Sequence, residues 1–323
     1  MDEALYRTAA HLVHAAQRIL LISHVHPDGD AVGSLLGLGL ALCNAGKQVQ
    51  MVLADGIPAS LRHLEGSDQI AFRPKGDFDL TCVLDCSDTE RIGDFYTHEM
   101  VIDINIDHHR TNLNFATHNF VDSQAVATAE LVFEFLQVLG YPLTQPVAAA
   151  LLTGLITDTI GFRTGNMTPK ALRMSASLME AGGNLPELYH RALITRSFEA
   201  ARFWGAGLIK LEREGRLVWT TLTQADRQMA SYPGRDDADL INMLSSIEPA
   251  DIAVIFVEQA NGHVKVSWRA KSGIDVSQLA LEYGGGGHAA ASGADVMGSL
   301  PEVCAQVLAA TRVLLNGRYS ADR

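Results

Sequence analysis

The sequence feature that most constrains the fold is a short turn with metal-binding side chains between an apolar run and a helix-forming stretch. Residues 19–22 have the length and composition of a buried parallel strand, and residues 31–45 are rich in Ala, Leu and Gly, as in a buried helix. His24, Asp28 and Asp30 therefore lie where open α/β sheets build ligand sites, at the carboxyl end of a strand. A simpler interpretation is that the two aspartates only cap the helix and the loop.

Length and composition exclude several classes of protein. The chain has 323 residues, which predicts about two domains, and its 47% hydrophobic content supports full cores. The net charge of −12 argues against binding of long duplexes, because that affinity comes from neutralising many phosphates. Four cysteines are too few for a disulfide scaffold. No apolar run has membrane-spanning length and the start lacks a basic secretory signal, so we expect a cytoplasmic protein.

The expected elements of the first half alternate between strands and helices. Further strands are expected at 48–54, 81–85 and 100–106, and helices at 2–18, 58–64, 124–139, 146–157 and 168–181. This alternation predicts an α/β domain with a mostly parallel, doubly wound sheet. We assign residues 1–185 to this domain.

The second half is expected to form a smaller α+β domain. Strands are predicted at 217–222, 252–258 and 264–270, and a helix at 300–315. Asn261-Gly262, between the last two strands, is a strong hairpin signal. We assign residues 186–204 to a linker and residues 205–323 to this domain, with the active site expected in the cleft between the two domains.

Acidic residues and histidines recur where the strands of the first domain are expected to end. Asp85 follows one strand, Asp107-His108-His109 follows another, and Asp158 ends a buried helix. Because the carboxyl ends of parallel strands lie side by side, we expect these groups to meet. The candidate metal ligands are His24, Asp28, Asp30, Asp85, His108 and Asp158. Such a set favours Mn²⁺ or Mg²⁺ and is large enough for two ions that share a carboxylate, although the histidine pair could also be packed structurally.

A second signal is a run of four glycines at 284–287, followed by His288 and small residues. We expect exposed backbone N–H groups and then a helix whose N-terminus favours negative charge, which together form an anion cradle. Arg163 and Arg269 are candidates for binding a phosphate or a carboxylate. The alternatives are a flexible linker for the glycines and ordinary ion pairs for the arginines.

Together these motifs resemble the DHH phosphoesterase superfamily with its associated C-terminal domain. The similarity rests on His24-Val-His-Pro-Asp-Gly-Asp30, Asp85, Asp107-His-His109, Asp158 and the glycines before His288, in the same order over nearly the whole chain. Chain length and domain plan resemble the nano-RNase and pAp phosphatase branch. The resemblance implies a hydrolase that cleaves short oligoribonucleotides such as pApA to nucleoside monophosphates, pAp to AMP and phosphate, or both.

The resemblance also implies roles for individual residues. One divalent ion, Mn²⁺ before Mg²⁺ or Co²⁺, would be held by His24, Asp28 and Asp85, and a second by Asp30, Asp85, His108 and Asp158. Asp107, His109 and Arg163 are the catalytic candidates, with Asp107 orienting its neighbours and His109 facing the phosphate or the leaving oxygen. The substrate would be held by Arg269, Gly285, Gly286, Gly287 and His288.

One departure from the family pattern leaves the substrate open. Many relatives have a basic residue soon after the histidine of the glycine motif, and this chain has Ala289-Ala290-Ala291 instead. The alternatives are a cyclic-dinucleotide (c-di-AMP) phosphodiesterase, a manganese-dependent inorganic pyrophosphatase and a nucleotide-binding sensor without turnover. The expected partners are short single-stranded RNA or small nucleotides, with no membrane, and a homodimer is left open.

Overall fold

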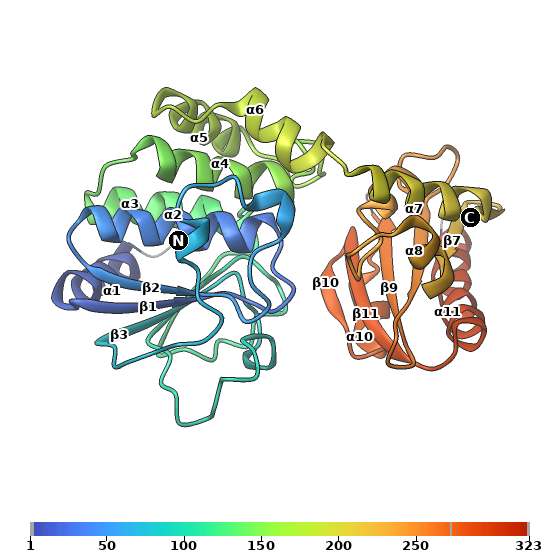
Figure 1. The fold of residues 1–323 in the computed structure, drawn as a ribbon, viewed down its shortest axis with the longest axis horizontal. Coiled ribbons are helices and arrows are strands. Elements are labelled where there is room, and N and C mark those ends of the chain that lie inside the picture. The colour runs from blue at the N-terminus through green and yellow to red at the C-terminus, as the bar shows by residue number, and fades with distance from the viewer. Residues whose placement is uncertain (1–2, 272, 322–323) are drawn as a thin grey trace. The chain divides into compact units, whose positions relative to one another are not determined.

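A computed structural model describes residues 3–271 and 273–321 of the chain. It divides into two compact units, Met1–Thr195 and Arg196–Arg323, which are described separately here (Figure 1). The predicted linker, residues 186–204, contains helical segments on both sides of this division: α6 (Leu185–Tyr189), a π-helical turn (His190–Ile194) and α7 (Phe198–Ile209). Within the described residues, none of the helices is long and apolar enough to span a membrane.

The first unit is built on a five-stranded, all-parallel sheet in the order β2-β1-β3-β4-β5. The strands are β1 (Arg18–Ile22), β2 (Gln48–Val52), β3 (Leu80–Leu84), β4 (Ile104–Asp107) and β5 (His118–Val121). The first four confirm predicted strands, with β4 beginning at residue 104 rather than 100, whereas β5 was not predicted. The α/β class and the parallel sheet are therefore confirmed.

Helices cover one face of this sheet. The helices that contact it are α1 (Glu3–Ala15), α2 (Gly29–Asn44) and α3 (Thr128–Leu139). A further helix, α4 (Gln145–Asp158), packs on α2 and α3, and α5 (Pro169–Glu180) packs on α4, so that α2, α3 and α4 are stacked on the same side (Figure 1). Leu20, Ile22 and Val83 point to the opposite face, where they pack against the loops and short 3-10 turns that connect β3 and β4. The predicted helix at 58–64 is a 3-10 turn at Ala59–Leu61.

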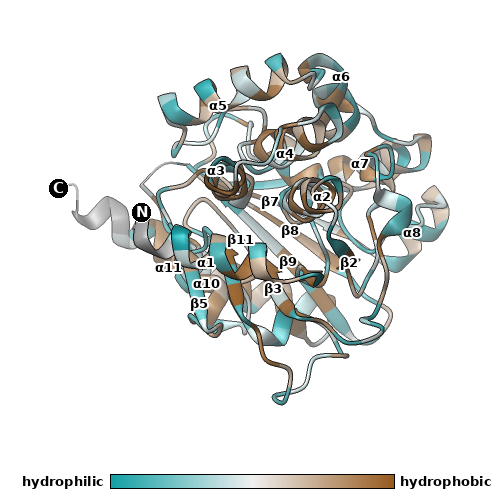
Figure 2. Ribbon diagram, turned by 90° about the vertical axis from the view of Figure 1, so that its left-hand side faces the viewer, coloured by the Kyte–Doolittle hydropathy of each residue, from teal (hydrophilic) through white to brown (hydrophobic). Residues whose placement is uncertain are grey.

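Close packing between α2 and α4 determines where the end of α4 lies. Both helices are largely apolar (Figure 2), and a β-carbon at Gly33 would lie 2.5 Å from the carbonyl oxygen of Ala150. A β-carbon at Gly154 would lie 2.8 Å from a carboxylate oxygen of Asp30. Small residues on both helices thus allow the carboxyl end of α4, with Asp158, to reach the start of α2.

The second unit contains a six-stranded mixed sheet in the order β10-β11-β9-β8-β7-β6. Its strands are β6 (Glu212–Glu214), β7 (Leu217–Leu222), β8 (Ile252–Glu258), β9 (His263–Ala270), β10 (Gly286–His288) and β11 (Ala291–Met297). Its helices besides α7 are α8 (Gln224–Ala230), α9 (Leu240–Leu244), α10 (Ser277–Glu282) and α11 (Leu300–Ala321). The predicted hairpin at Asn261-Gly262 is confirmed, because it joins the antiparallel strands β8 and β9.

The helix predicted after His288 is wrong. Residues 289–290 form a turn and Ala291 begins β11, which pairs antiparallel with β10. The glycines serve this hairpin: a β-carbon at Gly285 would lie 2.1 Å from the carbonyl oxygen of Gly293, and Gly287 has φ +132°. The run of alanines suggested a helix by propensity, but here small side chains allow close strand pairing instead.

Candidate metal centre and active site

His24 follows β1 and turns its imidazole toward the end of β3. Its Nδ1 lies 2.8 Å from the carbonyl oxygen of Val25, and its Nε2 lies 3.5 Å from Oδ2 of Asp85. Nε2 is the atom presented to the carboxylate, and a metal ion on Nε2 would leave the imidazole hydrogen on Nδ1 for the bond to Val25. The gap between Nε2 and Asp85 is wide enough for a cation that both side chains contact.

Asp28 and Asp30 are held by different helices. Asp28 caps α2, and its Oδ1 accepts from the backbone N–H of Asp30 and of Ala31, both at 3.0 Å. Asp30 is buried and accepts from the N–H groups of Thr128 at 2.6 Å and Ala129 at 2.9 Å, at the start of α3. The residue that caps α2 is therefore Asp28, not Asp30 as the capping interpretation has it, and capping does not exclude a ligand role for Asp28.

Asp85 lies at the centre of the cluster. It follows β3 with φ +54°, and its N–H donates to the carbonyl oxygen of Ile106 at 2.9 Å. The hydroxyl of Thr128 donates to Oδ1 of Asp85 at 2.8 Å. A tight backbone turn and a buried hydrogen bond thus fix this carboxylate in place.

The buried carboxylates have opposite pKa shifts. Burial raises the pKa of Asp30 well above its ordinary value, and the charges of Asp85 and Asp158 raise it further. Burial would also raise the pKa of Asp85, but contacts with three histidines outweigh burial and hold the pKa below its ordinary value. The cluster thus disfavours a negative charge on Asp30, whereas the neighbouring histidines stabilise the charge on Asp85.

His108 points into the same cluster from the end of β4. Its Nε2 lies 3.6 Å from Asp158, 3.8 Å from Asp85 and 3.9 Å from Asp30, in each case measured to a carboxylate oxygen. Its Nδ1 lies 3.3 Å from the carbonyl oxygen of Ala125. His108 thus resembles His24 in using Nδ1 for a backbone carbonyl and presenting Nε2 to acids.

Asp107 is fully buried and its carboxylate is already engaged by three donors. These are the N–H of His108 at 2.9 Å, Nδ1 of His109 at 2.7 Å and Nδ2 of Asn112 at 2.6 Å. Burial would lower the pKa of His109, but its bond to Asp107 and the charge of that residue outweigh burial and raise the pKa to about 9. Asp107 therefore fixes the ring of His109 and favours its protonated form.

The donor set fits divalent metal ions. Ligand atoms of His24, Asp28 and Asp85 lie within 4.8 Å of one another, and so do those of Asp30, Asp85 and His108. The two groups share Asp85. Imidazole nitrogens at 3.5–3.9 Å from carboxylate oxygens are too distant for good hydrogen bonds, which leaves room for a cation between them. Oxygen ligands in the majority favour Mn²⁺ or Mg²⁺ over metals that prefer sulfur.

The predicted substrate residues of the second unit lie on neighbouring strands. Ala291 of β11 is paired with His288 of β10 on one side and with Arg269 of β9 on the other. Directly opposite residues share a face of a sheet, so these side chains project on the same side. Nε of Arg269 donates to Oδ1 of Asn242 at 3.1 Å, and its Nη1 donates to the carbonyl oxygen of Trp268 at 3.0 Å. The small Ala291 separates the two predicted phosphate-binding side chains.

Arg163 is exposed on the loop after α4, where its Nε donates to the carbonyl oxygen of Ile160 at 3.0 Å. It is not part of the ligand groups described above.

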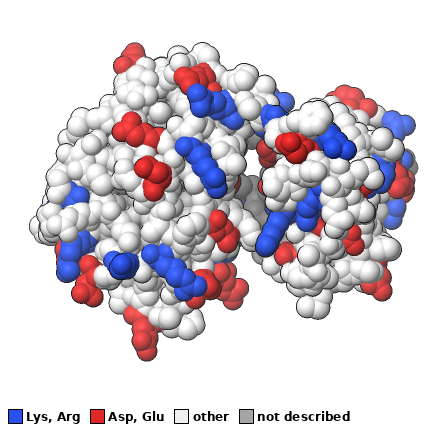
Figure 3. Space-filling model, in the orientation of Figure 1, with Lys and Arg blue, Asp and Glu red and all other residues white. Residues whose placement is uncertain are grey.

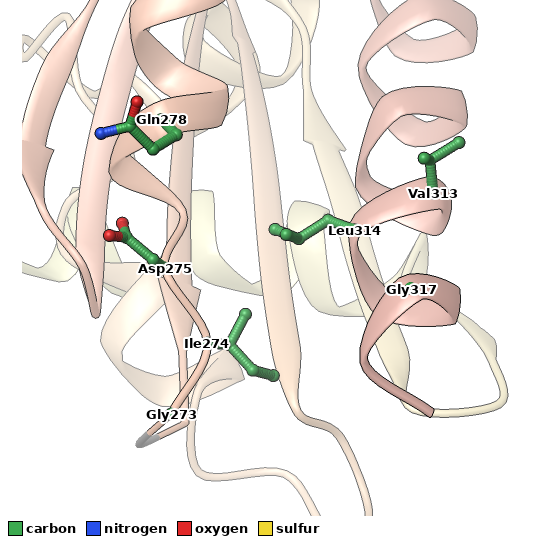
Figure 4. A pocket seen from close by; sticks show the side chains of 7 residues that line it. All are labelled: Gly273, Ile274, Asp275, Gln278, Val313, Leu314 and Gly317. Carbon is green, nitrogen blue, oxygen red and sulfur yellow. The ribbon is translucent and has the colours of Figure 1, made fainter. Parts of the chain in front are cut away.

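A pocket of about 520 Å³ lies in the second unit (Figure 4). It is lined by Ile274, Leu314 and neighbouring side chains of the loop before α10 and of α11, and it contains none of the predicted site residues.

Sequence reasoning missed several residues that support the cluster. Thr128 contacts both Asp30 and Asp85, Asn112 binds Asp107, and Arg91 lies beside His24. Thr128 could have been found in the sequence because it is a polar residue at the start of a helix whose buried side is otherwise mostly apolar. Asn112 and Arg91 lie in loops, where the sequence has no periodic pattern.

Comparison with known proteins identifies the family. Residues 18–155 match the DHH family, N-terminal domain, and residues 230–313 match the DHHA1 domain. The chain is 36% identical over 301 residues to the bifunctional oligoribonuclease and PAP phosphatase NrnA of Thermus thermophilus, which covers 91% of this chain and 89% of the relative. The chain belongs to the DHH phosphoesterase family.

Further proteins are similar to this chain in sequence or in fold. The NrnA protein of Mycoplasma pneumoniae is 28% identical over 88% of this chain and 90% of its own length. An exopolyphosphatase-related protein from Bacteroides fragilis has a TM-score of 0.88 and 25% identity, over 100% of this chain and 98% of its own. RecJ of Thermus thermophilus, solved in complex with Mn²⁺, shares the fold with a TM-score of 0.53 and 16% identity, over 96% of this chain and 55% of its own.

Proposed function

We propose that this DHH protein is a bifunctional phosphoesterase that hydrolyses short oligoribonucleotides to nucleoside monophosphates and pAp to AMP and phosphate. The observation that carries the hydrolytic chemistry is the pair of ligand groups that share the buried carboxylate of Asp85. Relatives named as oligoribonuclease and PAP phosphatase, similar over about nine-tenths of the chain, support the substrate class. Basic and acidic side chains are interspersed on the surface shown in Figure 3, which suits small substrates better than long duplexes.

The metal ligands are proposed in two sets. His24, Asp28 and Asp85 would hold one ion, and Asp30, Asp85, His108 and Asp158 the other. Mn²⁺ is the favoured ion, because the ligands are mostly oxygens and because RecJ, with the same fold, was solved with Mn²⁺. When bound, such a pair of ions neutralises charge on the phosphoryl oxygens and activates a water molecule.

His109 is proposed to supply the proton for the leaving group. Its Nδ1 is held by Asp107 at 2.7 Å, so Nε2 is the atom available to the substrate. With its pKa raised to about 9, Nε2 carries a hydrogen at neutral pH and can donate it to the departing oxygen. Asp107 positions the ring in this scheme and does not itself move a proton.

Arg269, His288 and the backbone of Gly285, Gly286 and Gly287 are proposed to bind the phosphate and the nucleotide of the substrate. Arg269 and His288 flank Ala291 on one face of the sheet, and Asn242 holds the Nε of Arg269. Arg163 was also proposed from the sequence as a catalytic residue, and its exposed position gives that role no geometric support.

The proposal is tested by hydrolysis assays of the purified protein with and without Mn²⁺. The panel contains 5′-labelled pApA, a longer single-stranded RNA, pAp, cyclic di-AMP and pyrophosphate. We expect fast loss of pApA and pAp and little loss of the others. Turnover of pyrophosphate or cyclic di-AMP alone would replace the proposed substrates, and tight nucleotide binding without turnover would make the protein a sensor.

A further inference from the structure

Arg91 lies beside the metal-ligand cluster, although nothing in the sequence pattern singled it out. It ends a 3-10 turn (Thr89–Arg91) in the connection after β3, and Asp88 caps this turn by accepting from the N–H of Glu90 at 2.8 Å. The carbonyl oxygen of Arg91 accepts from the N–H of Val25 at 2.7 Å. The backbone of Arg91 is therefore tied to the loop that carries His24.

The guanidinium of Arg91 competes with a backbone carbonyl for one nitrogen of His24. Nη2 of Arg91 lies 3.1 Å from Nδ1 of His24, and the same Nδ1 lies 2.8 Å from the carbonyl oxygen of Val25. Nδ1 can donate to Val25 or accept from Arg91, but one nitrogen cannot do both at once.

Binding of a cation at Nε2 of His24 resolves this competition. The imidazole hydrogen then has to be on Nδ1, where it donates to Val25. Nη2 of Arg91 then faces the Nδ1–H of His24, which cannot accept a hydrogen bond. The hydrogen on Nη2 therefore needs another acceptor. Metal binding would thus release one donor of Arg91 at the edge of the cluster.

The charge of Arg91 also affects His109, a proposed catalytic residue. Arg91 is half-buried, and its charge opposes the upward pKa shift of His109. Among the residues that the structure describes, no carboxylate forms an ion pair with Arg91, although the chain has 37 acidic residues. A half-buried arginine without an acidic partner is suited to an anion that arrives with the substrate.

We propose that Arg91 binds a non-bridging oxygen of the substrate phosphate once His24 holds its metal ion. The inference rests on the proposed function, and it gives the first unit a phosphate contact of its own. The ligand class is a phosphate monoester or diester, whose oxygens match the planar fork of the guanidinium.

The test compares Arg91→Gln and Arg91→Lys with Arg73→Gln as the matched control. Arg73 is a surface arginine of the same unit that pairs with Asp94. Inorganic phosphate binding to the Mn²⁺-loaded protein is measured by calorimetry, together with Mn²⁺ affinity, the KM for pAp and thermal unfolding as a check of folding. We expect R91Q to weaken phosphate binding and raise the KM by about 10- to 100-fold, the range for a hydrogen bond between charged groups, with Mn²⁺ affinity changed less than about twofold.

The control variants and the contrary results separate phosphate binding by Arg91 from a supporting role for His24. Arg91→Lys should recover part of the phosphate affinity, because it restores the charge without the fork, and Arg73→Gln should match the wild type. Unchanged phosphate affinity in R91Q overturns the inference. So does a loss of Mn²⁺ affinity with normal phosphate binding at saturating Mn²⁺, since Arg91 would then only support His24. Phosphate binding that depends on Arg91 in a protein that hydrolyses none of the panel would sustain this inference and reject the proposed function.

Discussion

The two ends of the parallel sheet in the first unit use aspartate in opposite ways. At the amino ends of β1 and β3, Asp79 accepts from the N–H of Arg18 at 2.8 Å and pairs with its guanidinium at 2.9 Å. At the carboxyl ends, Asp30 and Asp85 are buried beside other acids and histidines. The chain supplies the balancing cation at the first end. At the second end, three histidines balance Asp85 in part, and we propose that divalent ions supply the rest.

This difference separates an aspartate that stabilises the fold from those that form a site. Buried carboxylates are costly unless they are paired, and here the N-terminus of α3 offsets only part of that cost through the N–H groups of Thr128 and Ala129. These bonds place Asp30 without neutralising it. The carboxyl end of the sheet thus has buried His and Asp groups that could hold divalent cations, whereas Asp79 at the amino end already pairs with Arg18.

The sharpest test of this contrast is Asp85→Asn against Asp79→Asn. Asp85 belongs to both ligand groups, so we expect its substitution to remove Mn²⁺ binding and to lower hydrolysis of pAp on the order of 10³-fold or more. Asp79→Asn should leave both properties unchanged. Mn²⁺ titration followed by electron paramagnetic resonance, together with the hydrolysis assay, measures both. Near-normal turnover in D85N would reject a centre that shares this carboxylate.

A second test separates proton donation from metal binding. His109→Gln should lower kcat by about 10²- to 10⁴-fold, the usual contribution of a general acid, with Mn²⁺ affinity little changed. The reason is that Nδ1 of His109 is engaged by Asp107 and its pKa is raised to about 9, as a proton donor needs. A parallel loss of Mn²⁺ binding would instead assign His109 to the ligands.

The third test concerns Thr128 of α3, which donates hydrogen bonds to both Asp30 and Asp85. Thr128→Val removes the hydroxyl that donates to Asp85 at 2.8 Å while keeping the side-chain shape, and Thr128→Ser keeps the hydroxyl. We expect Mn²⁺ affinity to fall about 10- to 100-fold in the valine variant and to stay near normal in the serine variant, as for other residues that orient metal ligands. Equal affinities in both variants would show that backbone bonds alone position Asp85.

The sequence predicted only one side of this contrast, the acidic residues at the carboxyl ends of the strands. Acidic residues directly after apolar strands, such as Asp85 and Asp107, were placed correctly because strand ends follow from local hydrophobic patterns. The approach of Asp158 depends on contact between α2 and α4 through Gly33, which a local pattern does not show. Thr128 and Arg91 gain their contacts from segments distant in the chain, so no window of sequence identifies them.

The second unit shows where local propensity misled. Ala289-Ala290-Ala291 has strong helix propensity, yet strand pairing of β10 and β11 overrides it, because the neighbouring glycines let the backbones approach closely. Strand β5 was missed for the opposite reason: His118–Val121 is short and half polar, and it is a strand only because β4 pairs with it.

The smallest effect is expected from pH at the amino end of the sheet. Hydrogen bonds from the N–H and guanidinium of Arg18 and from the N–H of Gln17 lower the pKa of Asp79 from 3.8 to about 2. A carboxyl whose pKa is lower in the folded state adds stability above its unfolded value, and this is lost as pH falls through the folded value. The unfolding free energies of wild type and Asp79→Asn should therefore differ by a constant amount above about pH 5 and converge toward pH 2. Because both side chains are exposed to solvent, the difference should be small. Urea unfolding of the metal-free proteins across this pH range measures it. A free-energy difference that does not vary with pH would mean that the negative charge of Asp79 does not stabilise the fold. The pairing of Asp79 with Arg18 would then not be the feature that distinguishes the amino end of the sheet.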